Sequence, residues 1–77
     1  MDAEKLVQMA NRIGEFFAAW PDRDEAMEGI ATHLRKFWEP RMRRDLLALI
    51  DAGQADVLMP LVLEAVIRRR QGLEPNG

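Results

Sequence analysis

Prolines divide this chain into short segments, and they restrict its fold more than any other feature of the sequence. Pro21, Pro40 and Pro60 separate stretches in which apolar residues recur at intervals of three and four. Proline lacks a backbone donor and disfavours a helical conformation in the residue before it, so helices end near a proline or begin with one. The pattern therefore predicts several short helices. No stretch shows the alternation that is typical of strands.

Four helices are predicted from these stretches and their capping residues. Their limits are Asp2 to Pro21, Asp22 or Asp24 to Trp38, Pro40 to Gly53, and about Pro60 to about Arg70. The first two must form an antiparallel hairpin, because only a few residues join them. The predicted fold is all-α, a compact three- to four-helix bundle that begins with this hairpin. Residues 1–70 are expected to form a single domain, and residues 71–77 a flexible C-terminal tail.

The same spacing predicts which residues face the core. The predicted core positions are Leu6, Met9, Ile13, Phe16, Phe17, Trp20, Met27, Ile30, Ala31, Leu34, Phe37, Trp38, Met42, Leu46, Leu49, Ile50, Leu58, Leu61, Val62, Ala65 and Val66. Leu47 and Val7 lie off their stripes. Leu63 and Ile67, one helical turn apart, are predicted to project away from the core. They are either ordinary exposed apolar residues or part of a docking surface.

The composition excludes most kinds of chemistry. The chain has no cysteine, so disulfides and iron–sulfur ligation are excluded, and with a single histidine, His33, a zinc site would need almost only carboxylate ligands and is not expected. It has no serine or tyrosine and no glycine-rich loop, so neither a nucleophilic nor a phosphate-binding constellation can be assembled. We therefore predict a non-catalytic domain that binds no cofactor or metal alone.

The length and the apolar runs indicate where such a domain works. A chain of 77 residues buries only about 60% of its unfolded surface, so a partner is the expected external support. The first residues lack the pattern of a signal peptide. The longest apolar run, residues 57–63, contains Pro60 and is too short to span a bilayer. We expect a cytoplasmic protein without membrane contact.

Positive charge is concentrated in one short segment. Residues 32–44 contain five basic residues against Glu39, whereas the segments on both sides are acidic. Arg41, Arg43 and Arg44 stand at the start of a predicted helix, where its dipole disfavours positive charge. Such guanidinium groups suit a partner's carboxylates or phosphates, although a solvated face paired with acidic neighbours is the alternative. We predict partner binding by Glu39 and these arginines, together with Leu63 and Ile67.

Two blocks of sequence resemble the formate dehydrogenase delta subunit family. They are Leu6–Phe17 and Trp38–Arg44, and Pro60–Val62 with Glu64 and Ala65 fits the C-terminal part of the family. The resemblance covers roughly residues 5–70. It implies an accessory subunit that supports assembly, or molybdenum-cofactor loading, of the catalytic (alpha) subunit of a cytoplasmic, NAD-dependent formate dehydrogenase. The parent complex would carry molybdopterin guanine dinucleotide, iron–sulfur clusters, FMN and NAD.

A small nucleic-acid-binding regulator is the competing interpretation. The break at Glu39–Pro40 could mimic a helix-turn-helix, with the three arginines in the recognition position. The helix that follows has no Asn, Gln, Ser or Thr to contact base edges, and the protein is acidic overall, so we expect no nucleic-acid binding. Two possibilities stay open: the arginines could hold the pyrophosphate of a molybdopterin dinucleotide, and the isolated chain could self-associate.

Overall fold

Every regular element of the computed structural model is helical in the residues that it describes, 2–75. The elements are α1 (Ala3–Ala18), α2 (Arg23–Phe37), α3 (Pro40–Asp51), the 3-10 helix η1 (Ala55–Val57), α4 (Pro60–Arg68) and α5 (Arg70–Leu73). This confirms the predicted all-α bundle. None of the described helices is both long and apolar enough to cross a bilayer.

The helix ends follow from the capping residues. The carboxylate of Asp2 accepts hydrogen bonds from two backbone N–H groups in the first turn of α1, at 2.7 and 3.2 Å. Asp22, rather than Asp24, caps α2 through a bond of 3.1 Å to a backbone N–H group. Pro40 begins α3 and Pro60 begins α4, as predicted.

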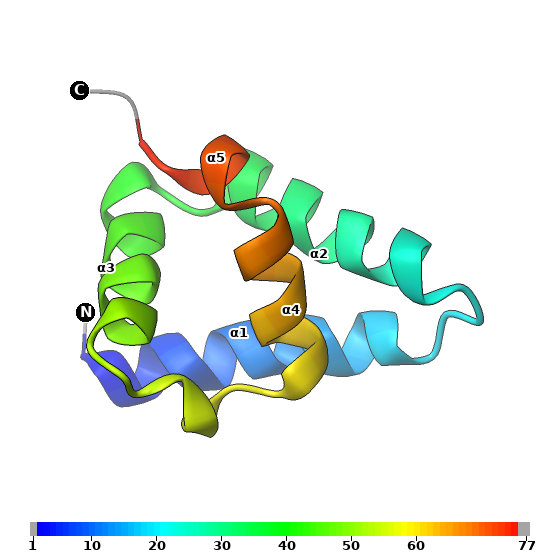
Figure 1. Ribbon diagram of the computed structural model, residues 1–77, viewed down its shortest axis with the longest axis horizontal. Coiled ribbons are helices and arrows are strands. Elements are labelled where there is room, and N and C mark those ends of the chain that lie inside the picture. The colour runs from blue at the N-terminus through cyan, green and yellow to red at the C-terminus, as the bar shows by residue number, and fades with distance from the viewer. Residues whose placement is uncertain (1, 76–77) are drawn as a thin grey trace.

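The helices are arranged around the α1–α2 hairpin (Figure 1). α1 and α2 run antiparallel, as predicted, and α3 stands across their open end. α4 packs on one face of the hairpin and contacts both of its helices, while α5 turns back onto α2. The hairpin is therefore the frame to which the remaining helices attach.

The core lies between the hairpin, α3 and α4. Its most deeply buried large side chains are Leu6, Ile30, Leu34, Leu46, Val62 and Val66. α1 also contributes Ala10 and Gly14 to the buried surface. A Cβ atom on Gly14 would overlap the Val62 side chain, so the bare backbone lets α4 approach α1 closely.

A side chain of α1 holds the connection between α3 and α4 in place. The amide nitrogen of Asn11 donates to the carbonyl of Val57 at 3.1 Å. Its amide oxygen accepts from the backbone N–H of Met59 at 2.9 Å. Met59 directly precedes α4, so these two bonds fix where α4 begins on the hairpin.

Three predicted core rings are exposed instead. Phe16, Trp20 and Phe37 are 66%, 42% and 71% exposed. α1 buries the row of Leu6, Ala10 and Gly14, which turns Phe16 outward. Trp20 lies beyond the last residue of α1, and Phe37 is the last residue of α2. The core prediction was wrong for these rings.

Leu47 departs from the prediction in the opposite sense. It was expected to lie off the apolar stripe, yet it is buried together with Leu46 and Leu49. α3 stands across the open end of the hairpin rather than along it, so a wider arc of its surface is covered.

Helical structure that packs on the bundle continues past residue 70, where the tail was predicted to begin. Arg69 interrupts the helix after α4, and α5 then carries Leu73 into the core, where it is 2% exposed. The two glycines and the proline in residues 71–77 suggested a tail, but a single buried leucine is enough to return the chain to the bundle. Residues 76 and 77 of the predicted tail lie outside the described residues.

Candidate partner-docking surfaces

The predicted arginine cluster occupies the first turns of α3. Arg41 and Arg44 are exposed and Arg43 is half-buried, as their positions on the helix predict. Within residues 2–75, none of the three lies within ion-pair distance of a carboxylate, and the Nε of Arg43 is buried without a hydrogen-bond partner. Glu39 precedes the helix but makes no capping bond with its side chain. The alternative of arginines paired with Glu39 or Asp45 is therefore not observed.

Arg23 of α2 and the three arginines at positions 68–70 are paired instead. The ion pairs join Arg23 to Glu64 at 2.6 Å, Arg68 to Glu64 at 3.0 Å, Arg69 to Glu28 at 3.2 Å, Arg70 to Asp51 at 2.7 Å and Arg70 to Glu74 at 3.3 Å. The hydrogen bond from Arg23 lowers the pKa of Glu64, and that from Arg70 lowers the pKa of Asp51. Except for Arg68, whose pair lies within α4, these arginines connect separate parts of the chain, which the α3 arginines do not.

The predicted pair Leu63 and Ile67 is divided by the structure. Ile67 is 57% exposed, whereas Leu63 is half-buried and packs against the core. The two residues therefore do not form a joint exposed patch. Their role in partner binding stays a prediction.

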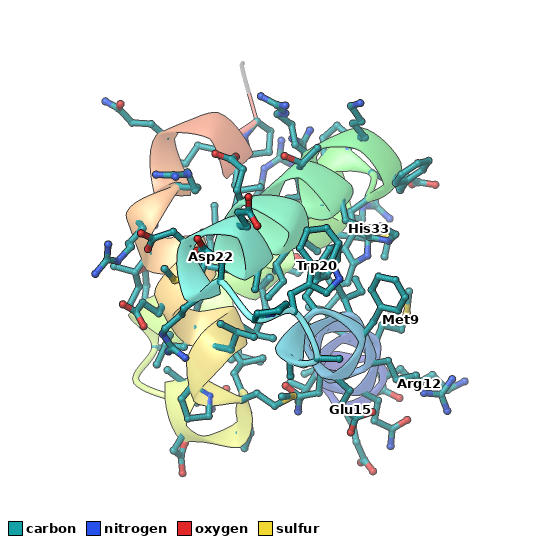
Figure 2. All side chains as sticks on the ribbon, turned by 90° about the vertical axis from the view of Figure 1, so that its right-hand side faces the viewer. Met9, Arg12, Glu15, Trp20, Asp22 and His33 are labelled. Atoms are coloured by element: carbon teal, nitrogen blue, oxygen red, sulfur yellow. The ribbon has the colours of Figure 1, made fainter. Side chains whose placement is uncertain are left out.

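An exposed surface of aromatic and apolar residues on the hairpin was not predicted as a site. We call it the aromatic face, and it consists of Met9, Ile13, Phe16, Phe17, Trp20, His33 and Phe37. In Figure 2, Met9, Arg12 and His33 lie on the side of the hairpin away from α4. Two open hollows of about 580 and 430 Å³ run along this face. No helix of the described chain covers it.

The rings of the aromatic face pack against one another. The ring centroids of Phe16 and Phe17 lie 5.0 Å apart, and those of Phe17 and Trp20 lie 4.9 Å apart, both edge to face. The ring of His33 lies 4.9 Å from that of Phe37. Such contacts hold rings in defined positions even where solvent reaches them.

Gly29 gives the aromatic face its depth. A Cβ atom at this position would overlap the ring of Phe17, so that ring rests directly on the backbone of α2. Phe17 is half-buried, whereas Phe16 and Phe37 are largely exposed. Phe17 thus forms a floor, and its more exposed neighbours form walls.

Charged residues border the aromatic face unevenly. Glu25 and Glu28 line it near the turn of the hairpin, beside Trp20. Arg12 and Lys36 line it further from that turn. The antiparallel order of the two helices places opposite charges toward opposite ends of the same surface.

Sequence reasoning missed this surface because it treated each helix as having one apolar stripe. α1 has two: the small residues Ala10 and Gly14 continue from Leu6, and a second row passes through Ile13 and Phe16. The small residues were the signal that could have revealed the second stripe, because a close helix contact requires them.

Within residues 2–75 no group of three or more histidine or acidic side chains is placed to hold a metal ion. Comparison with curated proteins and with solved structures finds no match. The family model of the NADH-dependent formate dehydrogenase delta subunit, FdsD, matches residues 5–66. The matched region includes nearly all of the hairpin, the whole of α3 and most of α4. The chain therefore belongs to the formate dehydrogenase delta subunit family, and it is an accessory subunit of a formate dehydrogenase.

Proposed function

We propose that this chain binds the catalytic (alpha) subunit of a cytoplasmic, NAD-dependent formate dehydrogenase and supports its assembly or its loading with molybdenum cofactor. In this role the chain is not catalytic and holds no cofactor alone. The molybdopterin guanine dinucleotide, iron–sulfur clusters, FMN and NAD of the complex would belong to the other subunits.

The observation that carries the proposal is the uncompensated charge of Arg41, Arg43 and Arg44. Each positive charge in the first turn of a helix costs about 0.3–1 kcal/mol. Nothing within residues 2–75 offsets that cost, and the buried Nε of Arg43 lacks an acceptor. Carboxylates of a partner would supply both the countercharge and the missing acceptor.

Replacing these three arginines with glutamine tests the proposed contact. Glutamine preserves the helix propensity and removes the charge, so the melting temperature should stay unchanged or rise slightly. Capture of the catalytic subunit should weaken, because loss of one desolvated charged partner typically costs about 2–5 kcal/mol. A control triple variant, with Lys5, Arg35 and Arg68 replaced by glutamine, changes the net charge equally on other surfaces and should retain capture.

A titration with duplex DNA at two salt concentrations separates this role from the regulator interpretation. A nucleic-acid-binding domain would bind with an affinity that falls steeply with salt, and the triple variant would reduce that slope. We expect no such binding. Salt-dependent binding together with undiminished capture of the catalytic subunit would contradict the proposed contact.

Producing the catalytic subunit with and without this chain tests the role itself. A lower molybdenum content without the chain would indicate a function in cofactor loading. A normal molybdenum content with less assembled complex would indicate a function in assembly. If molybdenum content, assembly and formate oxidation all stay unchanged, the proposed function is wrong.

A further inference from the structure

We infer that the aromatic face receives one amphipathic helix of the catalytic subunit, which lies lengthwise between α1 and α2. This inference rests on the proposed function and adds to it the surface and the chemistry of the contact. It does not depend on the arginine cluster of α3, which is a separate set of residues.

The spacing of the aromatic face fits a helix as its occupant. Met9, Ile13 and Phe16 recur along α1 at steps of four and three, which is the spacing of a coiled-coil seam, and Trp20 follows just past the end of α1. On α2, His33 and Phe37 follow Gly29 at steps of four on one side of the helix. Two such rows form a groove that accepts apolar residues repeating every three or four positions.

The packing of α4 shows how the hairpin already binds a helix on its other face. α4 presents apolar residues to the hairpin and adds ion pairs at the edges. One of these pairs joins Arg23 of α2 to Glu64 of α4 at 2.6 Å. The aromatic face offers the same combination of an apolar centre and charged borders, but no described element of the chain occupies it.

The exposed rings indicate that a partner covers this face. Phe16 is 66% exposed and Phe37 is 71% exposed, and both line a hollow of the aromatic face. Single exposed apolar residues are ordinary, whereas grouped aromatic rings mark interaction sites. Aromatic residues are also those that most often dominate the binding energy of an interface.

The charges define the chemistry and direction of the bound helix. Arg12 and Lys36 have no ion-pair partner among the described residues, and both lie away from the hairpin turn. The bound helix should therefore carry acidic residues at that end. From Met9 to Phe16 the helical part of the seam is about 10 Å long, so the bound helix contributes at least about two turns to the contact.

A double variant tests the surface. Phe16→Gln with Phe37→Gln removes two exposed rings, and the control, Val57→Gln, removes an exposed apolar side chain that lies outside every predicted binding surface. We expect the first variant to bind the catalytic subunit at least about tenfold more weakly than the wild type, and the control to bind within about twofold. Circular dichroism should show that both variants remain folded.

Other outcomes of this experiment overturn the inference in distinguishable ways. Wild-type protein that fails to bind the catalytic subunit overturns the proposed function and this inference together. Wild-type binding that the double variant leaves unchanged overturns the inference alone. If the wild type is a dimer that the variant dissociates, while capture is unaffected, the face pairs two copies of this chain instead.

A photo-reactive phenylalanine analogue placed at position 37 gives a second test that depends little on the fold, because the native ring there is exposed. The analogue is crosslinked in the native complex, and mass spectrometry identifies the residues to which it attaches. It should attach to a segment of the catalytic subunit that has apolar residues every three or four positions and acidic residues at one end. Attachment to a segment without this pattern, or to no segment of the catalytic subunit, would overturn the helical occupant.

Discussion

At Phe37 and Trp38, two neighbouring aromatic residues enter opposite environments. Phe37 ends α2 and is 71% exposed, whereas Trp38 is 6% exposed. The backbone of Trp38 is extended, with ψ at 134°, so its side chain no longer follows the helical rotation and turns into the core. A change of backbone conformation at one residue therefore separates a structural ring from a surface ring.

Alanine substitution should distinguish these two rings. Trp38→Ala removes a buried ring and should lower the free energy of unfolding by about 3–5 kcal/mol. Phe37→Ala removes an exposed ring and should change it by no more than about 0.5 kcal/mol. Urea denaturation of both variants measures the difference. Equal destabilisation by the two substitutions would contradict the burial of Trp38 or the exposure of Phe37.

Residue spacing predicted much of the core correctly, including Leu6, Ile30, Leu34 and Val62. It did not predict the orientation of Phe16, because periodicity places a residue on a helix face but does not state what that face meets. When a helix has apolar residues on two sides, predicting which side is buried requires the positions of the neighbouring helices. That knowledge came only from the position of α4 on the hairpin.

Among the elements, α5 shows how few contacts can hold a short segment. It consists of Arg70–Leu73, which is too short to be a stable helix alone. Leu73 anchors it in the core, and the guanidinium group of Arg70 forms two hydrogen bonds, of 2.9 and 2.7 Å, to the carboxylate of Asp51 in α3. The sequence could not reveal this, because nothing in it indicates that Leu73 returns to the core.

Removing the anchor of α5 should destabilise the whole domain. Leu73→Ala deletes a side chain that is 2% exposed and should cost about 2–5 kcal/mol in the free energy of unfolding. Gln71→Ala, an exposed position in the same helix, is the matched control and should have little effect. Thermal denaturation compares the two. A Leu73→Ala variant as stable as the control would restore the interpretation of this segment as a tail.

The ion pairs between elements should make stability depend on acid pH. Hydrogen bonds from arginines lower the pKa of Asp51 and of Glu64 in the folded protein. Their contribution is therefore complete above the ordinary pKa values of 3.8 and 4.5, and it is lost as the pH falls through the lowered values. Because Asp51 is exposed and Glu64 is only half-buried, the effect should be modest and should weaken in high salt.

A variant series over pH 2–7 measures this dependence. Asp51→Asn should have a melting temperature that falls less between about pH 4 and pH 2 than that of the wild type, because it lacks one of the linked protons. Asp56→Asn is the control, since Asp56 makes no ion pair among the described residues. Identical pH profiles for both variants would show that the Asp51–Arg70 pair contributes nothing in solution.

For the whole molecule, the small core and the open hairpin face have a common explanation in partner binding. The hairpin is covered by α4 on one face, and its other face is open to solvent. The all-α bundle was predictable because capping residues and prolines act locally. The open face was not, because it results from the packing of helices that are distant in sequence.

Binding of the catalytic subunit should protect this chain against local opening. A partner that binds only the folded state stabilises it by about 2.7 kcal/mol when present at a hundred times the dissociation constant. Hydrogen exchange of the chain's amides should therefore slow on binding, most of all in α1 and α2. The triple arginine variant, at the same concentrations, should show less protection. Exchange that is equal in the free and bound chain would contradict any stable association.

Gly14 and Gly29 lie on opposite faces of the hairpin, and each is in contact with a bulky side chain from elsewhere in the chain. Val62 presses on the first and Phe17 on the second. In any relative that shares this arrangement, an alanine at either glycine position requires a smaller partner residue, a moved side chain or a shifted helix. If two members of the family differ at a glycine position and at the residue that packs on it, the paired difference would show that both proteins keep this packing face. Sequences alone would be enough to find such pairs.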